Sequence, residues 1–313
     1  MLAGGVGAAR YLAGLLQVVD PAEVTAIVNT GDDTTLHGLR ICPDLDTVTY
    51  TLAGASNAEL GWGLQGDTWQ AMDSLVRFEA QAPAGSTAGA TWFRLGDRDL
   101  ATHLYRTQRL AEGAPLSTVA AELAAAWDLG LRLVPMTDDV VATMVTVEGE
   151  GEIGFQDYFV GRRHSVPVSG VRFDGIERAT PAPGVFEALD AGERIVIAPS
   201  NPVVSIGPVV AVPGVAERLR AQRERVVAVS PLVAGAALKG PADRMLTELG
   251  HESSVVGVAR LYAPIVGTLV VDVADADRAD EVEAAGVRCV VAPTVMSGPA
   301  EAAALARTTL EDR

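Results

Sequence analysis

Four aspartates stand close together in the chain, directly after an apolar stretch. Residues 23–28 (EVTAIV) are rich in β-branched side chains, which is typical of a buried strand. The carboxylates that follow are Asp32, Asp33, Asp44 and Asp46, with Arg40 among them. Carboxylates at this density repel one another unless a cation or a hydrogen-bond donor binds between them. Residues 29–46 are therefore predicted to form one loop that binds a hard cation such as Mg²⁺ or the hydroxyl groups of a substrate.

The place of these aspartates in the chain supports a functional interpretation. In an open α/β sheet, ligands bind beyond the carboxyl ends of the strands, and the acidic stretch begins at such an end. Any one of the four aspartates taken alone is more typical of a helix N-cap or a turn. For the four together we favour binding and catalysis over turn formation.

A glycine-rich turn opens the chain and leads into a helical pattern. Gly4, Gly5 and Gly7 are followed by Arg10, and only three residues precede the turn. Such a turn can present backbone N–H groups and the positive end of a helix dipole to a phosphate, and Arg10 can add a charge-assisted contact. The signal is weak by itself, because many glycine-rich turns are only tight turns. The strand before it is either very short or begins upstream of this sequence.

Two more polar side chains follow a later apolar strand. Residues 194–198 are predicted to be a buried strand, and Ser200 and Asn201 come after it between two prolines. The prolines make this loop rigid, and its polar side chains suit a nucleotide base or ribose. From about residue 170 onward, strands alternate with helices as in a parallel sheet. The glycine turn and this loop are therefore expected at the same edge of the sheet.

The middle of the chain, residues 52–130, is predicted to be a helical insertion. Within it, Asp97 and Asp99 flank an arginine at the start of a helix. An acidic helix N-terminus explains one of these aspartates through the helix dipole. It does not explain Arg94, which follows two aromatic residues and can point from this hydrophobic anchor into a cleft. Beyond the insertion, residues 140–147 and 153–160 are predicted to pair as a hairpin.

The composition is typical of a globular α/β protein. Its 313 residues suit one large domain or two modest ones, and 49% of them are hydrophobic. No apolar run is long enough to cross a bilayer, and the formal charge of −16 disfavours nucleic acid or an anionic membrane as a partner. We therefore expect a cytoplasmic protein. Its predicted fold is a Rossmann-like three-layer α/β/α parallel-sheet core at 1–51 and 131–313, with the helical insertion at 52–130.

Eight motifs in this order resemble one known family. They are the glycine turn and residues 29–33 (NTGDD), 43–47 (PDLDT), 95–99 (LGDRD), 135–139 (PMTDD), 155–157 (FQD), 199–202 (PSNP) and 205–208 (SIGP). Together they resemble the 2-phospho-L-lactate transferase family of coenzyme F-420 biosynthesis, including its phosphoenolpyruvate transferase branch. The resemblance covers nearly the whole chain.

The resemblance implies a transfer reaction. A guanosine diphosphate-linked donor carries lactate or enolpyruvate on its terminal phosphate, and the ribityl hydroxyl of the deazaflavin Fo attacks that phosphorus and releases GMP. Mg²⁺ is the implied metal, a homodimer is the implied assembly, and residues 52–130 are expected to cover the acceptor. By similarity, Asp46 and Arg94 match the positions that contact Fo. From the residues themselves we assign metal binding to Asp32, Asp33 and Asp44, catalysis to Asp32 and Asp46, and acceptor binding to Asp97 and Asp99 as well. The donor-binding candidates are Gly4, Gly5, Gly7, Arg10, Ser200 and Asn201.

Alternatives stay open at this point. A related family of nucleotide-sugar-binding regulators, of the gluconeogenesis-factor type, shares this fold and the glycine-rich opening, but the PDLDT and LGDRD stretches favour an acceptor site. A nicotinamide-dependent oxidoreductase needs an acidic residue at the end of a second strand to bind a ribose, and none stands in that context. Arg94 can instead form a surface ion pair with Asp97 or Asp99, a contact that contributes little. The choice between lactate and enolpyruvate is also open.

Overall fold

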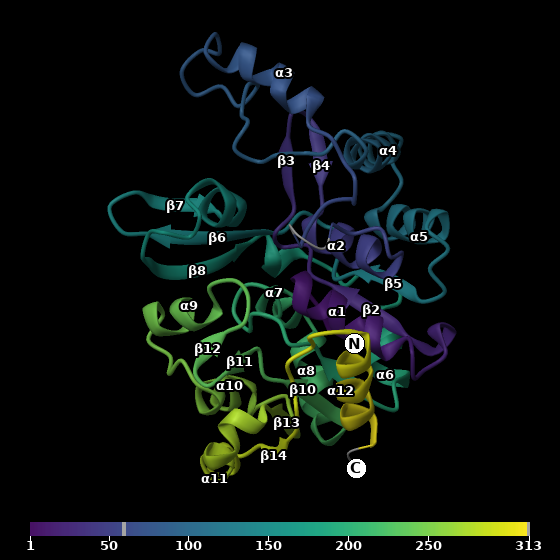
Figure 1. The fold of residues 1–313 in the computed structure, drawn as a ribbon, viewed down its shortest axis with the longest axis vertical. Coiled ribbons are helices and arrows are strands. Elements are labelled where there is room, and N and C mark those ends of the chain that lie inside the picture. The colour runs from purple at the N-terminus through teal and green to yellow at the C-terminus, as the bar shows by residue number, and fades with distance from the viewer. Residues whose placement is uncertain (58–60, 312–313) are drawn as a thin grey trace.

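A seven-stranded parallel sheet forms the centre of the protein in a computed structural model that describes residues 1–57 and 61–311 (Figure 1). The strand order is β14-β13-β10-β9-β1-β2-β5, and each neighbouring pair is parallel. The bounds are β1 Leu2–Ala3, β2 Thr25–Val28, β5 Arg132–Pro135, β9 Ile195–Ile197, β10 Val226–Val229, β13 Thr268–Val271 and β14 Arg288–Val291. The predicted α/β fold with a parallel sheet is confirmed, and its first strand is two residues long.

Apolar cores lie on both faces of the sheet, because successive strand residues point to opposite sides. In β9, Ile195 and Ile197 enter one core and Val196 enters the other. The helices α6 Val185–Ala191, α7 Gly207–Ala211, α8 Val215–Ala221, α9 Ala242–Glu248, α10 Val255–Tyr262 and α11 Ala279–Ala284 pack on the first core. The helices α1 Gly5–Leu15, α2 Pro43–Leu52, α5 Leu116–Ala126 and α12 Pro299–Glu311 pack on the second. The result is a three-layer α/β/α arrangement.

The strand order reverses next to β1. From β1 the chain proceeds through β2 to β5 at one edge, and from β9 it proceeds through β10 and β13 to β14 at the other. Loops that leave β1 and β9 therefore diverge and leave a crevice at the carboxyl ends of these two strands. Such a reversal is where open α/β sheets bind ligands.

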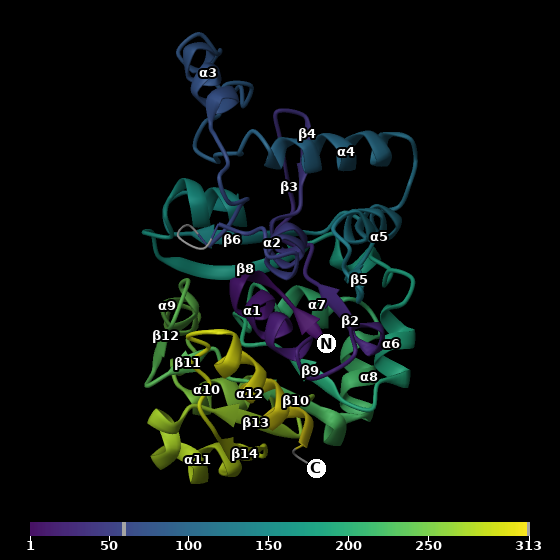
Figure 2. The ribbon, with the colours of Figure 1, turned by 45° about the vertical axis from the view of Figure 1, so that its right-hand side comes forward.

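A second group of elements lies at one end of the molecule, beyond α2 (Figures 1 and 2). It consists of the hairpin β3 Thr34–Leu36 with β4 Leu39–Ile41 and the helices α3 Gln70–Glu79 and α4 Asp99–Ala111. A small core of Leu36, Ile41, Met72 and Leu95 holds the hairpin and the insertion together. Part of the predicted insertion thus packs on the β3–β4 hairpin, while α5 lies in the layer that covers the sheet.

A three-stranded antiparallel sheet corrects the predicted hairpin. Its strands are β7 Gly151–Gly154, β6 Ala142–Val147 and β8 Val168–Asp174, in that order. The turn between β6 and β7 lies where it was expected, but the prediction that strand continues to residue 160 is wrong. β7 ends at Gly154, and Asp157–Gly161 forms a π-helical turn. The cause is tertiary, because Phe155 and Tyr158 are buried in a separate core with Val145 and Val168.

A short hairpin joins β11 Leu232–Val233 to β12 Ala236–Ala237. Among the helices of residues 1–57 and 61–311, none has both the length and the apolar character needed to cross a membrane.

We predict that the contact of α1 with α12 tolerates no extra atom at Gly14. A Cβ there would lie 2.3 Å from the carbonyl carbon and 2.5 Å from the carbonyl oxygen of Ala302. Gly14→Ala should therefore lower the free energy of unfolding by about 1–3 kcal/mol, as overpacking of a tight contact does. Gly154→Ala is the control, since a Cβ at that glycine meets no atom within 4 Å. Equal urea midpoints for the two variants would contradict the prediction.

Candidate functional site

A cavity of about 850 Å³ lies at the reversal point of the sheet. Its wall includes the residues that follow β1, β2, β9 and β10, represented by Gly4, Asp32, Ser200 and Ser230. The first turn of α2 and part of α4 contribute to the same wall. The cavity therefore lies between the sheet and the insertion, where a ligand can contact both.

The glycine turn forms one side of this cavity together with the Ser200-Asn201 loop. A Cβ at Gly4 would lie 2.8 Å from Cβ of Ser205, and a Cβ at Gly7 would lie 2.1 Å from the carbonyl oxygen of Pro199. Only glycine permits such close approach. The Ser200 hydroxyl donates a hydrogen bond of 2.7 Å to the Gly4 carbonyl. The turn and the loop thus pack as one unit.

All the residues predicted to bind the donor line this cavity: Gly4, Gly5, Gly7, Arg10, Ser200 and Asn201. The side chain of Asn201 is already engaged, because its Oδ1 accepts the backbone N–H groups of Val203 at 2.9 Å and Val204 at 3.3 Å. Arg10 is exposed on α1. The polar side chains of the loop therefore stabilise its shape, and their part in ligand binding stays a prediction.

Asp32 and Asp44 are the two acidic residues brought together beside the glycine turn. Asp44 accepts the Gly5 backbone N–H at 2.9 Å through Oδ1 and the Asn29 amide at 3.0 Å through Oδ2. Oδ1 of Asp32 is buried and has no hydrogen-bond partner in the described part of the chain. Burial, followed by the charge of Asp44, raises the pKa of Asp32 well above its usual range, and burial raises the pKa of Asp44 to about 6. Burial is the largest cause of both shifts, and no positively charged side chain is among their main causes.

Asp33 does not join this pair. Its Oδ2 accepts hydrogen bonds from Arg40 Nη2 at 3.1 Å and Cys42 Sγ at 2.9 Å, and it is not part of the cavity wall. Burial raises the pKa of Asp33 to about 7, although Arg40 opposes the shift. Over residues 1–57 and 61–311, no group of three or more His, Cys, Asp or Glu side chains is placed to hold a metal ion. The structure therefore does not bring the three predicted metal ligands together.

The reason lies in the secondary structure of residues 29–46, for which the prediction of a single loop is wrong. The β3–β4 hairpin intervenes, and α2 begins at Pro43. Asp44 and Asp46 lie in the first turn of α2, where the helix dipole favours carboxylates. Asp33 stands at the base of the hairpin and is drawn to Arg40 on the returning strand.

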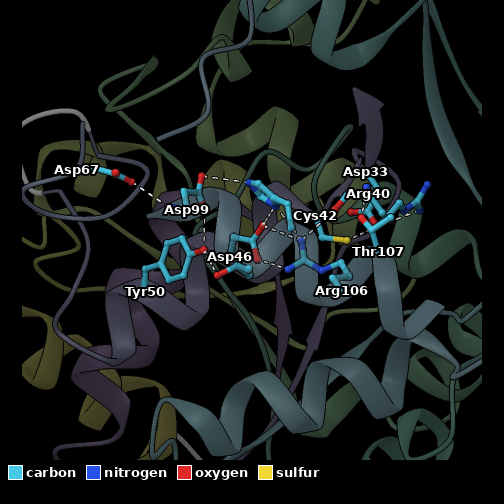
Figure 3. A network of polar contacts seen from close by, with 11 residues as sticks. Asp33, Arg40, Cys42, Asp46, Tyr50, Asp67, Asp99, Arg106 and Thr107 are labelled. Atoms are coloured by element: carbon cyan, nitrogen blue, oxygen red, sulfur yellow. Dashed lines mark hydrogen bonds and ion pairs between the residues drawn. The ribbon is translucent and has the colours of Figure 1, made fainter. Parts of the chain in front are cut away.

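Asp46 belongs to a buried polar network between α2 and α4 (Figure 3). Arg106 Nη1 donates to Asp46 Oδ2 at 3.1 Å, and Arg106 Nη2 bonds the other oxygen. His103 Nδ1 lies 3.7 Å from Asp46 Oδ2, and His103 Nε2 lies 3.2 Å from Asp99 Oδ2. The Tyr50 hydroxyl donates to Asp99 Oδ1 at 2.6 Å. Asp46, Tyr50, Asp99 and His103 all line the cavity, so the network reaches the site.

Electrostatics within the network favour an ionised Asp99. Burial opposes its charge, but hydrogen bonds from His103 and Tyr50 and the charge of Arg106 outweigh burial and lower its pKa below the usual range. Sequence reasoning selected Asp99 and missed Arg106. The available signal was the spacing of Asp99, His103 and Arg106, which places them on one face of a helix.

Arg94 and Asp97 have different surroundings from Asp99. Asp97 accepts backbone N–H bonds from Gln70 and Ala71, each 2.9 Å, so it caps the start of α3 and does not line the cavity. Arg94 does line it, yet its side chain is 46% exposed and pairs with Asp73 at 2.6 Å. Its guanidinium carbon also lies 5.1 Å from the ring centroid of Trp69. In the alternative interpretation Arg94 forms a surface ion pair with Asp97 or Asp99, but the ion pair in the structure is with Asp73.

Aromatic side chains form the part of the wall that sequence reasoning missed. The cavity is lined by Trp62, Trp92, Phe93, Phe155 and Phe159. The rings of Phe155 and Phe159 are stacked with centroids 5.4 Å apart. These residues come from distant parts of the chain, so only the fold brings them to one surface. Such a wall suits a planar aromatic ligand.

Comparisons with known proteins concern the family and the fold of this chain. The model of the family described as 2-phospho-L-lactate transferase CofD matches residues 1–294. A protein of Streptomyces griseus named phosphoenolpyruvate transferase is 47% identical over 99% of this chain and 96% of its own length. Proteins of the same name from Streptomyces coelicolor and Mycolicibacterium smegmatis are 46% and 39% identical, each over 99% of this chain and 96% and 97% of their own lengths.

A solved structure shares the fold. The crystal structure of a upf0052 family member from Bacillus halodurans has a TM-score of 0.61 and covers 99% of this chain and 97% of its own, at 16% identity. At this identity the likeness establishes the fold alone. The family match over most of the chain and the full-length relatives establish more: the chain belongs to the 2-phospho-L-lactate transferase family and is a transferase of coenzyme F-420 biosynthesis.

Proposed function

We propose that this protein transfers a phosphoenolpyruvyl group from a guanosine diphosphate-linked donor to the ribityl hydroxyl of Fo, with GMP as the leaving group. The observation that carries the proposal is the cavity at the sheet reversal, whose lining combines a glycine turn, aromatic rings and carboxylates. Enolpyruvate is preferred over lactate because the full-length relatives carry the name phosphoenolpyruvate transferase. A homodimer is the proposed assembly, on the family resemblance alone.

The donor is proposed to bind on the sheet side of the cavity. The N-terminus of α1 directs the positive end of its dipole toward the glycine turn, which suits a diphosphate. Arg10 lies on the same wall and can add a charge-assisted bond to a phosphate oxygen. The rigid Ser200-Asn201 loop beside the turn is the proposed contact for the nucleoside.

The acceptor is proposed to bind on the insertion side. The aromatic wall can stack on the deazaflavin rings, and Arg94 can hydrogen-bond their carbonyl groups or stack on them. Asp46 and Asp99 line the same cavity as the aromatic wall and the glycine turn, and their carboxylate oxygens can accept hydrogen bonds from ribityl hydroxyls. Positioning of this kind is the main contribution that phosphoryl transfer asks of a protein.

Asp32 and Asp44 are the residues proposed to hold Mg²⁺. Oδ1 of Asp32 is buried and unpartnered in the described residues, and the pKa values of both carboxylates are raised. Both features fit a pair of carboxylates that binds a cation. When bound, Mg²⁺ supplies charge neutralisation for the diphosphate and for the leaving phosphate. Asp33 is left out of the proposed set because it does not line the cavity and its carboxylate already pairs with Arg40, although its Oδ1 is also buried without a hydrogen-bond partner in the described residues.

The first prediction from the proposed function concerns the reaction itself. Purified protein supplied with Fo, Mg²⁺ and the guanosine diphosphate-linked enolpyruvate should yield a product with the mass of Fo plus a phosphoenolpyruvyl group, with one GMP released per product. Calorimetry should show tighter binding of GDP than of ADP or UDP. Tight binding of a UDP-sugar without any transfer would instead support the regulatory alternative.

The second prediction concerns the metal. Mg²⁺ should raise the thermal midpoint of the wild-type protein, because a ligand at a hundredfold its Kd stabilises the folded state by about 2.7 kcal/mol. Asp32→Asn should abolish most of this shift. Asp33→Asn is the matched control and should retain the shift, because the Asp33 carboxylate pairs with Arg40 and does not line the cavity. A shift lost in Asp33→Asn and kept in Asp32→Asn would reverse the assignment.

The third prediction concerns Arg94. If its guanidinium binds the acceptor, Arg94→Ala should raise the KM for Fo about tenfold and leave the KM for the donor nearly unchanged. Asp73→Ala breaks the same surface ion pair without removing the guanidinium, so it should leave both constants close to those of the wild type. Equal effects of the two substitutions would assign Arg94 a structural role only.

A further inference from the structure

Arg106 is the largest side chain among those that are almost fully buried, with 1% of its surface exposed. It projects from α4 in the insertion to Asp46 on α2. We infer that Arg106 is a positioning residue for the transfer reaction: its guanidinium fixes the Asp46 carboxylate at the edge of the cavity, so the insertion sets the geometry of the acceptor site. The inference rests on the proposed function, in which Asp46 contacts Fo.

The two aspartates in the first turn of α2 have different anchors. Asp44 is held from the sheet side, by the backbone N–H of Gly5 and the amide of Asn29. Within residues 1–57 and 61–311, the Asp46 carboxylate has its hydrogen-bond and ion-pair partners in Arg106 and His103, both on α4. The orientation of the Asp46 side chain is therefore determined by α4 and not by the sheet.

The contact between Arg106 and Asp46 is bidentate, and this geometry restricts the orientation of a carboxylate most. Nη1 and Nη2 of Arg106 each bond one oxygen of Asp46, and such a two-point contact defines both the position and the plane of the carboxylate. A lysine ammonium is a point charge and cannot reproduce this fork. Because both side chains are buried, loss of the guanidinium would also leave a charged Asp46 without its counterion.

Further hydrogen bonds fix the position of α4 relative to the cavity. Arg106 Nη1 donates to the Arg40 carbonyl at 3.3 Å, and the Arg40 backbone N–H donates to the Thr107 hydroxyl at 2.8 Å (Figure 3). On the opposite side, Tyr50 of α2 donates to Asp99 of α4. The helix is thus tied to the β3–β4 hairpin and to α2, so the guanidinium that it carries has a defined place relative to the cavity.

The first test compares Arg106→Ala and Arg106→Lys with a matched control, Arg109→Ala. Arg109 lies on the same helix and pairs with Glu112 and Glu122 away from the cavity. Both Arg106 variants should lower kcat by about a hundredfold, the cost of a small displacement of a catalytic group, and leave the KM for the donor within about threefold. Arg109→Ala should stay within about twofold of the wild type.

A double-mutant cycle separates positioning from general structural support. Fo affinity, followed by titration of its fluorescence, is measured for the wild type, Asp46→Asn, Arg106→Ala and the double variant. If Arg106 acts through Asp46, its loss should weaken Fo binding about tenfold in the wild-type background and less than about twofold in the Asp46→Asn background. A similar factor in both backgrounds would overturn the inference.

The outcomes distinguish failure of the inference about Arg106 from failure of the proposed function. If Arg106→Ala does not fold, Arg106→Lys takes its place in the cycle, since it retains a cation in the buried position. If the wild type binds Fo but transfers nothing, the proposed function fails and the cycle on Fo affinity still tests the inference. If the wild type transfers and Arg106→Lys keeps the full kcat, the inference fails and the proposed function stands.

Discussion

β1 is held at the centre of the sheet by parallel pairing on both sides. Leu2 pairs with Ile27 of β2 and with Ile197 of β9, although the strand is only two residues long. This pairing places the glycine turn between the loops that follow β2 and β9. The close approach of Gly7 to the Pro199 carbonyl follows from it, and so does the hydrogen bond from Ser200 to Gly4. If β1 were displaced, the donor side of the cavity would lose its wall.

The second constraint is the burial of negative charge in an acidic protein. The carboxylates in and beside the cavity differ in the positively charged or hydrogen-bonding side chains that surround them. Asp33 has Arg40, Asp46 has Arg106, and Asp99 has His103 and Tyr50. Within residues 1–57 and 61–311 no ion pair is formed by Asp32 or Asp44, and burial raises the pKa of both. This difference is why we propose a bound cation for this pair and a substrate-orienting role for Asp46 and Asp99, which line the cavity.

The local sequence pattern predicted some of the secondary-structure elements correctly and others wrongly. The strands of the sheet and the turn near residue 149 were predictable, because they depend on short apolar runs and on glycine. The second arm of the β6–β7 hairpin was not, since Phe155 and Tyr158 are drawn into a core with residues far along the chain. Asp97 was assigned to the acceptor site for its place in the LGDRD motif, yet it caps α3, whose start lies far before it in the sequence.

The sequence by itself determined the fold class, the family and some of the stretches that line the cavity, because apolar periodicity and ordered motifs can be recognised along the linear chain. Only the tertiary structure decided which side chains of those stretches face the cavity. Asp33 and Asp46 look alike in the sequence, but one turns to Arg40 across a hairpin and the other to Arg106, sixty positions away. Pairing of buried charges across such separations depends on how α4 packs against α2, and no local pattern encodes that packing.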